Sequence, residues 1–229
     1  MQDMTKVRQG ICELFKNTGI REITEEQYKK FGFPKFLQFM KFQTYLYQVE
    51  NFGYLMMLQS KSITGMELLT CSFTPATGIQ MPYLLIDCML MKKKSMVFTE
   101  FYDCTEKHSD YPELQRVYKK YESEMDYNEK PAWYVSERTE FSLIKQFPTD
   151  EDSAFTNMIY DTVLGYIGEI RNAKVNVNNL AGLRKLRHRM ITEGNPATGI
   201  LKGAFGKEGA VTFYRKCVMP IDTGERDRI

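Results

Sequence analysis

The sequence lacks the features that identify membrane, secreted and nucleic-acid-binding proteins. No apolar run approaches the roughly 20 residues that a membrane-spanning helix needs. Lys6, Arg8 and Glu13 interrupt the apolar residues near the N-terminus, so this segment does not resemble a secretory signal. The charge is balanced, with 31 Lys and Arg against 29 Asp and Glu and a net charge of +2. We therefore expect neither a membrane nor a nucleic acid as a partner.

Motifs for metals, disulfides and nucleotide cofactors are also missing. The chain has two histidines and five widely spaced cysteines without a CxxC pair, which argues against a metal cluster or a disulfide framework. Neither GxGxxG nor GxxxxGK[ST] occurs, so the common loops for dinucleotides and phosphates are absent. We expect no metal and no bound cofactor. The free thiols suit a reducing compartment: the cytoplasm, or the plastid stroma if the protein is eukaryotic and processed.

Aromatic residues, by contrast, are abundant. The 229 residues include 15 Phe, 14 Tyr and one Trp, or 13% of the chain. So many aromatic rings suit either a dense core or a pocket for a flat, conjugated ligand, and composition does not choose between the two. The length fits a single domain spanning residues 1–229.

The middle of the chain has the pattern of an antiparallel sheet. Short runs rich in apolar and aromatic residues alternate there with turn signals. These runs are residues 45–49, 54–60, 66–73, 83–91 and 95–102. Connections this short make consecutive strands antiparallel neighbours, because a parallel crossover needs a dozen or more residues. Residues 133–144 are predicted to add a further strand or two.

Helical spacing dominates both ends of the chain. A capping box at residues 24–27 predicts a short helix before Pro34, and Thr149 and Asp150 are predicted to cap a long helix. The remaining predicted helices cover residues 4–15, 112–127, 180–192, 197–205 and 208–218. Helices before and after a central, mainly antiparallel sheet predict a three-layer α/β/α sandwich.

Asp87 is the most informative single residue. It interrupts a run, residues 81–90, that otherwise resembles a buried strand. Burial raises the pKa of a carboxyl group, and an acid that keeps its proton near neutral pH can protonate a bound substrate. Alternation along the strand also allows a solvated Asp87, although the flanking Leu85 and Met89 are apolar. The pattern leaves both readings open.

Two cationic segments are candidates for anion binding. Residues 92–94 are three lysines at a predicted hairpin tip, where solvated side chains are the simpler reading. Residues 184–189 hold four cations and His188, and arginines there can bind carboxylates or phosphates in a bidentate manner. A solubilising helix face remains the simpler reading for most of this second segment.

Two stretches resemble the ferredoxin-dependent bilin reductase family. Residues 75–87 read Pro-Ala-Thr-Gly-Ile-Gln-Met-Pro-Tyr-Leu-Leu-Ile-Asp, similar to the family's Pro, Gly and Pro before a strand that bears a catalytic aspartate. Residues 195–206 begin Asn-Pro-Ala-Thr-Gly and end Phe-Gly, similar to the family's Asp-Pro-Ala-Arg-Gly segment and the Phe-Gly that follows it. Both motifs occur in the family's order.

The resemblance implies a sandwich that binds a linear tetrapyrrole, such as biliverdin, between the sheet and the C-terminal helices. It implies an enzyme without its own cofactor, to which reduced ferredoxin supplies single electrons, so that the reaction passes through bilin radicals. Asp87 would donate a proton and Asn195 would act beside it at the catalytic site. Thr70, Arg187 and Thr198 would contact the bilin, with Arg187 near its propionates. We expect the protein to be a monomer.

Two positions depart from the family pattern. Thr70 stands where one branch carries a histidine that pairs with the aspartate, and Asn195 stands where many members carry a second acid. A threonine or an amide can hydrogen-bond, but neither stores a proton near pH 7. We therefore expect a single two-electron reduction. The alternatives are a reductase of another open-chain tetrapyrrole, such as a chlorophyll catabolite, and a bilin-binding protein without catalysis.

Overall fold

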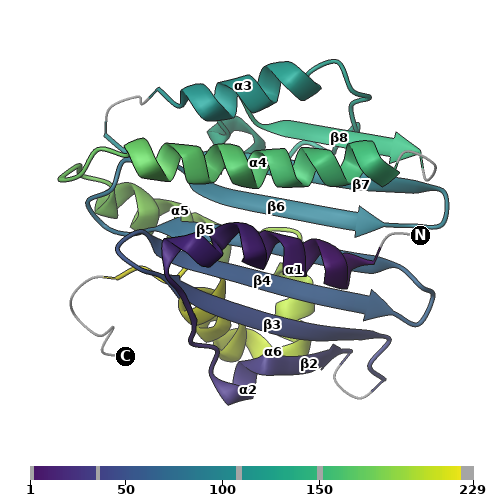
Figure 1. The fold of residues 1–229 in the computed structure, drawn as a ribbon. Coiled ribbons are helices and arrows are strands. Elements are labelled where there is room, and N and C mark those ends of the chain that lie inside the picture. The colour runs from purple at the N-terminus through teal and green to yellow at the C-terminus, as the bar shows by residue number, and fades with distance from the viewer. Residues whose placement is uncertain (1–2, 35–36, 107–109, 149–151, 223–229) are drawn as a thin grey trace.

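A computed structural model describes residues 3–34, 37–106, 110–148 and 152–222 of the chain. Within these ranges the strands form one eight-stranded antiparallel sheet, and helices cover both of its faces (Figure 1). This architecture confirms the predicted three-layer α/β/α sandwich.

Consecutive strands of the sheet are neighbours from β3 to β7, as the short connections predict. In order across the sheet, the strands are β1 (Ile20–Glu22), β3 (Met40–Val49), β4 (Gly53–Ser62), β5 (Glu67–Pro75), β6 (Tyr83–Leu90), β7 (Lys94–Tyr102) and β8 (Leu143–Pro148). A further strand, β2 (Lys30–Phe33), pairs with one end of β3, next to β1.

The helices divide between the two faces. The front of the sheet in Figure 1 carries α1 (Met4–Phe15) and α4 (Asp152–Asn172), with α3 (Pro112–Tyr121) packed beside α4. The back carries α5 (Leu180–Thr192) and α6 (Thr198–Phe213), and the short α2 (Glu26–Lys29) leads into β2. Within the described residues, no helix is both long and apolar enough to cross a bilayer.

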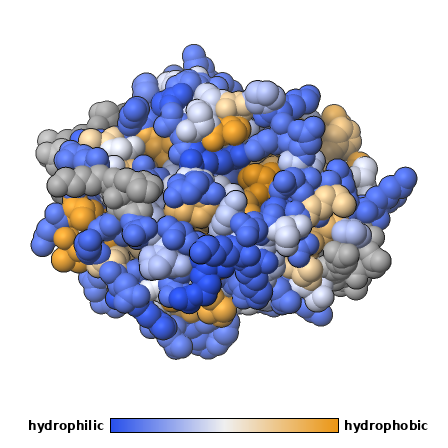
Figure 2. Space-filling view, turned by 90° about the horizontal axis from the view of Figure 1, so that it is seen from above, coloured by the Kyte–Doolittle hydropathy of each residue, from blue (hydrophilic) through white to orange (hydrophobic). Residues whose placement is uncertain are grey.

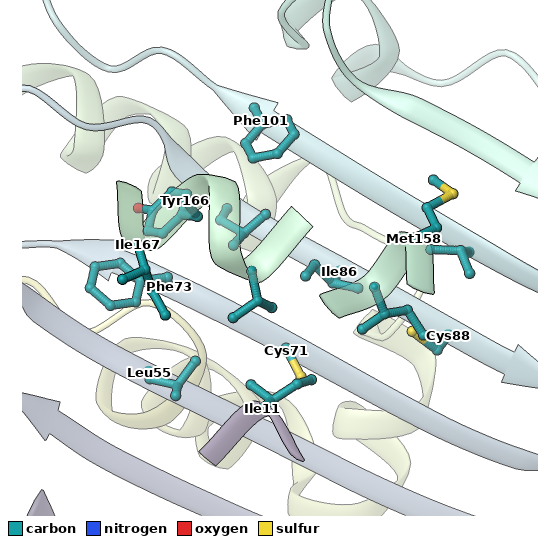
Figure 3. Close-up of a cluster of buried hydrophobic side chains, with 14 of the residues drawn as sticks. Ile11, Leu55, Cys71, Phe73, Ile86, Cys88, Phe101, Met158, Tyr166 and Ile167 are labelled. Atoms are coloured by element: carbon teal, nitrogen blue, oxygen red, sulfur yellow. The ribbon is translucent and has the colours of Figure 1, made fainter. Parts of the chain in front are cut away.

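The front core is built from alternate residues of the central strands. Figure 3 shows Ile11 of α1 and Met158 and Tyr166 of α4 over the sheet side chains. Those sheet side chains are Leu55, Cys71, Phe73, Ile86, Cys88 and Phe101. Since successive strand residues point to opposite faces, their neighbours along each strand point toward α5 and α6. This alternation decides which polar residues face the C-terminal helices.

The outer surface over α3 has a different character from the core. Seen from that side, it is mostly hydrophilic, and hydrophobic residues form separate patches (Figure 2). No broad apolar face is visible from this direction.

The prediction of a capping box at residues 24–27 is wrong. Thr24 Oγ1 accepts a hydrogen bond from the backbone N–H of Leu46 at 2.8 Å, so this side chain fastens the segment to β3. Glu25, which precedes α2, makes no side-chain capping bond. The helix has only four residues, and the chain continues directly into β2 because β3 offers a strand to pair with.

The prediction of a strand across residues 133–144 is wrong over most of its length. Trp133–Glu137 forms a 3₁₀ helix, and β8 begins only at Leu143. The Trp133 indole N–H donates to the Gly194 carbonyl at 2.7 Å, which holds this segment against the loop between α5 and α6. A tertiary contact of this kind leaves no periodic signal in the sequence.

The helix predicted at residues 112–127 ends at Tyr121. Beyond it the chain wraps around the buried ammonium group of Lys145, which donates to the carbonyls of Glu122 and Glu124 and to Asp126 Oδ1 at 2.7–2.9 Å. The last two predicted helices are joined as α6, which is interrupted at Gly206 (φ 74°), and a π-helical turn follows at Tyr214–Val218. Thr149 and Asp150 lie outside the described residues.

The close approach of α5 to the end of β7 yields a stability prediction. A Cβ atom on Gly182 would lie 2.1 Å from the backbone oxygen of Cys104, whereas a Cβ on Gly199 would meet nothing within 4 Å. We expect Gly182→Ala to lower the free energy of unfolding by about 1–3 kcal/mol, as overpacking usually does. Gly199→Ala, the control, should be neutral or slightly stabilising. Equal denaturation midpoints for the two variants would contradict this packing.

Candidate active site

A cavity of about 270 Å³ lies between the back of the sheet and the beginning of α6. Its walls are mainly apolar and come from strands β3 to β7 and from α6. They include Phe42, Leu58, Leu68, Met89, Phe98 and Ile200. Its polar side chains come from strands β4, β5, β6 and β7 and from the segment that leads to β8. The cavity thus combines a mainly apolar wall with several polar and charged groups.

Asp87 lies in the floor of this cavity. In the sheet register it stands between Thr70 of β5 and Phe98 of β7, on the face that looks toward α6. The Thr70 hydroxyl donates to Asp87 Oδ1 at 2.5 Å, and Oδ2 has no hydrogen-bond partner among the described residues. The half-buried side chain thus lines a mainly apolar cavity, which favours the reading of Asp87 as a buried acid over a solvated one.

The surroundings of Asp87 favour its protonated form. Burial raises the pKa of this carboxyl group above its ordinary value, and the Thr70 hydrogen bond and the charge of Arg138 oppose the rise only in part. A carboxylic acid with one oxygen held by a hydroxyl and the other facing a cavity has the geometry of a proton donor.

A second carboxyl group, Glu100 of β7, also lines the cavity. The Arg138 guanidinium binds it, with Nη2 at 2.9 Å from Glu100 Oε1, and the Tyr102 hydroxyl donates to Oε2. Arg138 also donates to both oxygens of Glu129. The side chains of Glu100 and Arg138 are only 6% and 7% exposed, so a linked group of charges lies at the cavity wall.

Burial raises the pKa of Glu100 to about 7. The Arg138 charge and the Tyr102 hydrogen bond lower it, whereas the nearby Asp87 charge raises it. Sequence reasoning missed Glu100, although it carries the same signal as Asp87: a carboxylate inside a strand-like run, residues 95–102. Arg138 has no comparable signal, because it follows an irregular segment.

The other predicted site residues lie outside the cavity wall. Arg187 is buried on α5, with Nη1 3.5 Å from the Met219 carbonyl oxygen. Asn195 donates from Nδ2 to the Met190 carbonyl and accepts the Ala197 N–H at Oδ1, while Thr198 Oγ1 accepts the Asn195 N–H. Asn195 and Thr198 therefore shape the turn that presents Pro196 and Ala197 to the cavity.

The cations of residues 184–189 are likewise absent from the cavity wall, where the arginine is Arg138. Arg189 instead pairs with Glu137 and Glu193 and lies over the Trp133 ring, 4.3 Å from its centroid. Across the described ranges, no group of three or more His, Cys, Asp or Glu side chains is placed to hold a metal ion.

Comparison with known proteins finds a likeness in structure alone. No family model matches the chain, and no curated protein sequence matches it. The fold is similar to that of phytochromobilin synthase from tomato, whose crystal structure is a complex with biliverdin. The likeness has a TM-score of 0.73 and covers 92% of this chain and 80% of that chain, with 13% sequence identity. At this identity, the shared feature is the fold.

The raised pKa of Asp87 predicts how stability depends on pH. A carboxyl group whose pKa is higher in the folded than in the unfolded state binds more protons when folded, so it destabilises the fold as pH rises above its unfolded pKa, about 3.9. Asp87→Asn removes this effect. We expect the variant to be more stable than wild type at pH 8, and the difference to vanish near pH 3.

Thermal unfolding of the two proteins across this pH range measures the effect. Glu208→Gln, at an exposed position of α6, provides the control and should follow the wild-type curve. A stability difference between Asp87→Asn and wild type that is constant with pH would contradict the raised pKa.

Proposed function

We propose that this protein reduces a linear tetrapyrrole, biliverdin or a close relative, with single electrons from reduced ferredoxin. The observation that carries the proposal is the position of Asp87. It is a protonatable acid at the floor of an apolar cavity, in a fold similar to that of a synthase crystallised with biliverdin. The protein would bind no cofactor of its own and would supply protons while ferredoxin supplies electrons.

The chemistry requires a proton for each electron. One two-electron reduction of the conjugated system consumes two electrons and two protons, so the groups that line the cavity must be able to give up protons and take them up again. Asp87 meets this requirement because Thr70 occupies Oδ1 and leaves Oδ2 toward the cavity. Thr70 is then a positioning residue, which fixes the direction of the carboxyl group.

The cavity suits part of a conjugated ligand. Its volume of about 270 Å³ lies just below the range of roughly 300–1,000 Å³ typical of small-molecule sites. A linear tetrapyrrole would place one section of its ring system against Phe42, Phe98 and Tyr134. The rest would extend beyond the cavity, which leaves its propionates near solvent.

A bilin-binding protein without catalysis remains the second candidate. Asn195 favours it, because its amide is engaged in the turn before α6 and is no substitute for an acid. Reduction of another open-chain tetrapyrrole is a variant of the first proposal with the same acid. Turnover distinguishes catalysis from binding, and comparison of substrates identifies the tetrapyrrole.

We expect wild type to bind biliverdin in a stoichiometric manner, with a shift in bilin absorbance, and to reduce it under anaerobic conditions with reduced ferredoxin. Asp87→Asn should bind with similar affinity, because its shape is nearly unchanged. Loss of the acid should slow reduction by about 100-fold or more. An absorbance titration followed by a turnover assay measures both.

Three outcomes separate the candidates in this assay. No absorbance shift at micromolar bilin would contradict bilin binding altogether. A shift without product would favour the binding protein. Turnover by Asp87→Asn at the wild-type rate would show that the proton comes from another group.

Docking of ferredoxin would use a basic surface, since plant-type ferredoxins are acidic. The candidates fall into two groups at opposite ends of β7. Residues 92–94 precede or begin this strand, whereas Arg184 lies on α5, which contacts Cys104 beyond its end. Arg187, on the same helix, is buried and offers no surface for docking. A nine-residue strand spans about 30 Å, so we expect one small partner to depend mainly on one of the two groups.

We expect the lysine group to dominate, because only a few residues of β6 separate it from Asp87 and electron transfer slows steeply with distance. Charge reversal at Lys92 and Lys93 should raise the KM for ferredoxin about tenfold at low salt, and added salt should remove the difference. Charge reversal at Arg184, the control, should have little effect. The opposite ranking would place the docking surface on α5.

A further inference from the structure

The cavity holds a carboxyl group that the proposed function does not use. We propose that Glu100 is a second acid–base residue of this site and supplies the second proton of each two-electron reduction. The inference rests on the proposed bilin reduction and adds a residue to it. It starts from the placement of two carboxyl groups on neighbouring strands, around one cavity.

Asp87 and Glu100 are close enough to serve one ligand. Asp87 is opposite Phe98 in the sheet register, and Glu100 is two residues further along β7 on the same face. Such diagonal neighbours in an antiparallel pair are about 7–8 Å apart at the backbone, within reach of long side chains. A conjugated section held over these strands would meet both groups.

The hydrogen bonds of Glu100 allow it to gain and lose a proton. Its Oε1 accepts from Arg138, which has no acceptor to offer, but its Oε2 is bonded to the Tyr102 hydroxyl. A hydroxyl group is both a donor and an acceptor. When Oε2 carries the proton, Tyr102 can accept it in the same hydrogen bond, so both states of Glu100 keep two partners.

Glu129 has no such freedom. Both of its oxygens accept from the Arg138 guanidinium, and a proton on either oxygen would break one of these charge-assisted bonds. Glu129 is also the more exposed partner, at 21% against 6% for Glu100. Glu129 thus balances the charge of Arg138, and Glu100 is left to exchange protons.

The balance of charges around the cavity also favours a protonated Glu100. The titratable side chains that face it are Asp87, Glu100, Glu129, Arg138 and Tyr134, and Tyr102 contacts Glu100 from behind. The residues that β3, β4, β5 and α6 contribute to the wall carry no charge. Arg138 is the one cation among the described side chains that face the cavity, and its charge can offset only one of the three carboxylates. Protonation of the other two removes the remaining negative charge, and the pKa of about 7 for Glu100 agrees with this.

Each reduction consumes two electrons and two protons. Two single electrons arrive in turn from the reduced ferredoxin, two atoms of the conjugated system accept one proton each, and one double bond is lost. Asp87 Oδ2–H supplies one proton, and Glu100 supplies the other when its Oε2–H turns from the Tyr102 hydroxyl to the bilin. Both carboxylates then take up protons from water before the next turnover.

Glu100→Gln tests this role, with Glu208→Gln, an exposed position of α6 outside the cavity wall, as the control. Anaerobic single turnovers with biliverdin and reduced methyl viologen avoid any dependence on ferredoxin docking. We expect Glu100→Gln to bind biliverdin with an affinity within threefold of wild type but to form product about 100-fold more slowly, with a half-reduced bilin accumulating. Glu208→Gln should stay within threefold, and Glu100→Asp should recover part of the rate.

A pH series separates acid–base chemistry from a structural role. The wild-type rate should fall as pH rises through about 7, where Glu100 loses its proton, and Glu100→Gln should lack this step. Infrared spectra of the unliganded protein should show one carboxylic acid band that disappears in Glu100→Gln and titrates near this pH.

Each contrary result has a distinct meaning. Wild-type turnover with an unimpaired Glu100→Gln overturns the role of Glu100 and leaves the proposed function intact. Equal losses in Glu100→Gln and Glu208→Gln, or a Glu100 that stays ionised at all pH values, likewise overturn it. Failure of wild type to reduce any bilin overturns the proposed function, and this inference with it.

Discussion

The alternation of side chains along β5, β6 and β7 is the constraint on which the rest of the site depends. On the front face these strands present Cys71, Ile86 and Val97, which pack against α1 and α4. On the back they present Thr70, Asp87 and Glu100 to the cavity. A shift of register by one residue would bury these polar groups in the front core and leave the cavity apolar. The same pairing therefore fixes the core and the chemistry.

Other buried charges in this structure show what makes the cavity different. Lys145 donates to three acceptors and holds the chain beyond α3, and Glu169 accepts the backbone N–H groups of Glu113 and Leu114 at the start of α3. The three bonds of Lys145 offset the cost of burying its charge, and both backbone N–H bonds to Glu169 go to its Oε1. Asp87 has one partner and an oxygen toward an open space. An ionised carboxyl group with an unbonded oxygen destabilises the fold. This cost is expected at a functional site, where a ligand or a proton completes the hydrogen bonding of the group.

Sequence patterns predicted the sheet well because it is made of hairpins, whose strands and turns are local. Asp87 was identifiable for the same reason: one acid in an apolar run is visible without knowledge of its partners. The pairing of Asp87 with Thr70 required alignment of two strands, and the turns at Trp133 and around Lys145 depend on contacts between distant segments. Glu100 has the same signal, one acid in the strand-like run of residues 95–102, so the sequence pattern identifies it as well as it identifies Asp87.

The position of Asn195 explains why an acid is expected elsewhere in the site. Its amide bonds the Met190 carbonyl and the Ala197 N–H at once, which needs a donor and an acceptor on one side chain. An ionised aspartate has no donor for the Met190 carbonyl, so this turn is built for an amide. The Asn195 side chain thus holds the turn before α6, and an amide is not a useful proton donor. If the cavity carries out a reduction, we expect its second proton to come from the sheet side, where Glu100 and Asp87 lie on neighbouring strands.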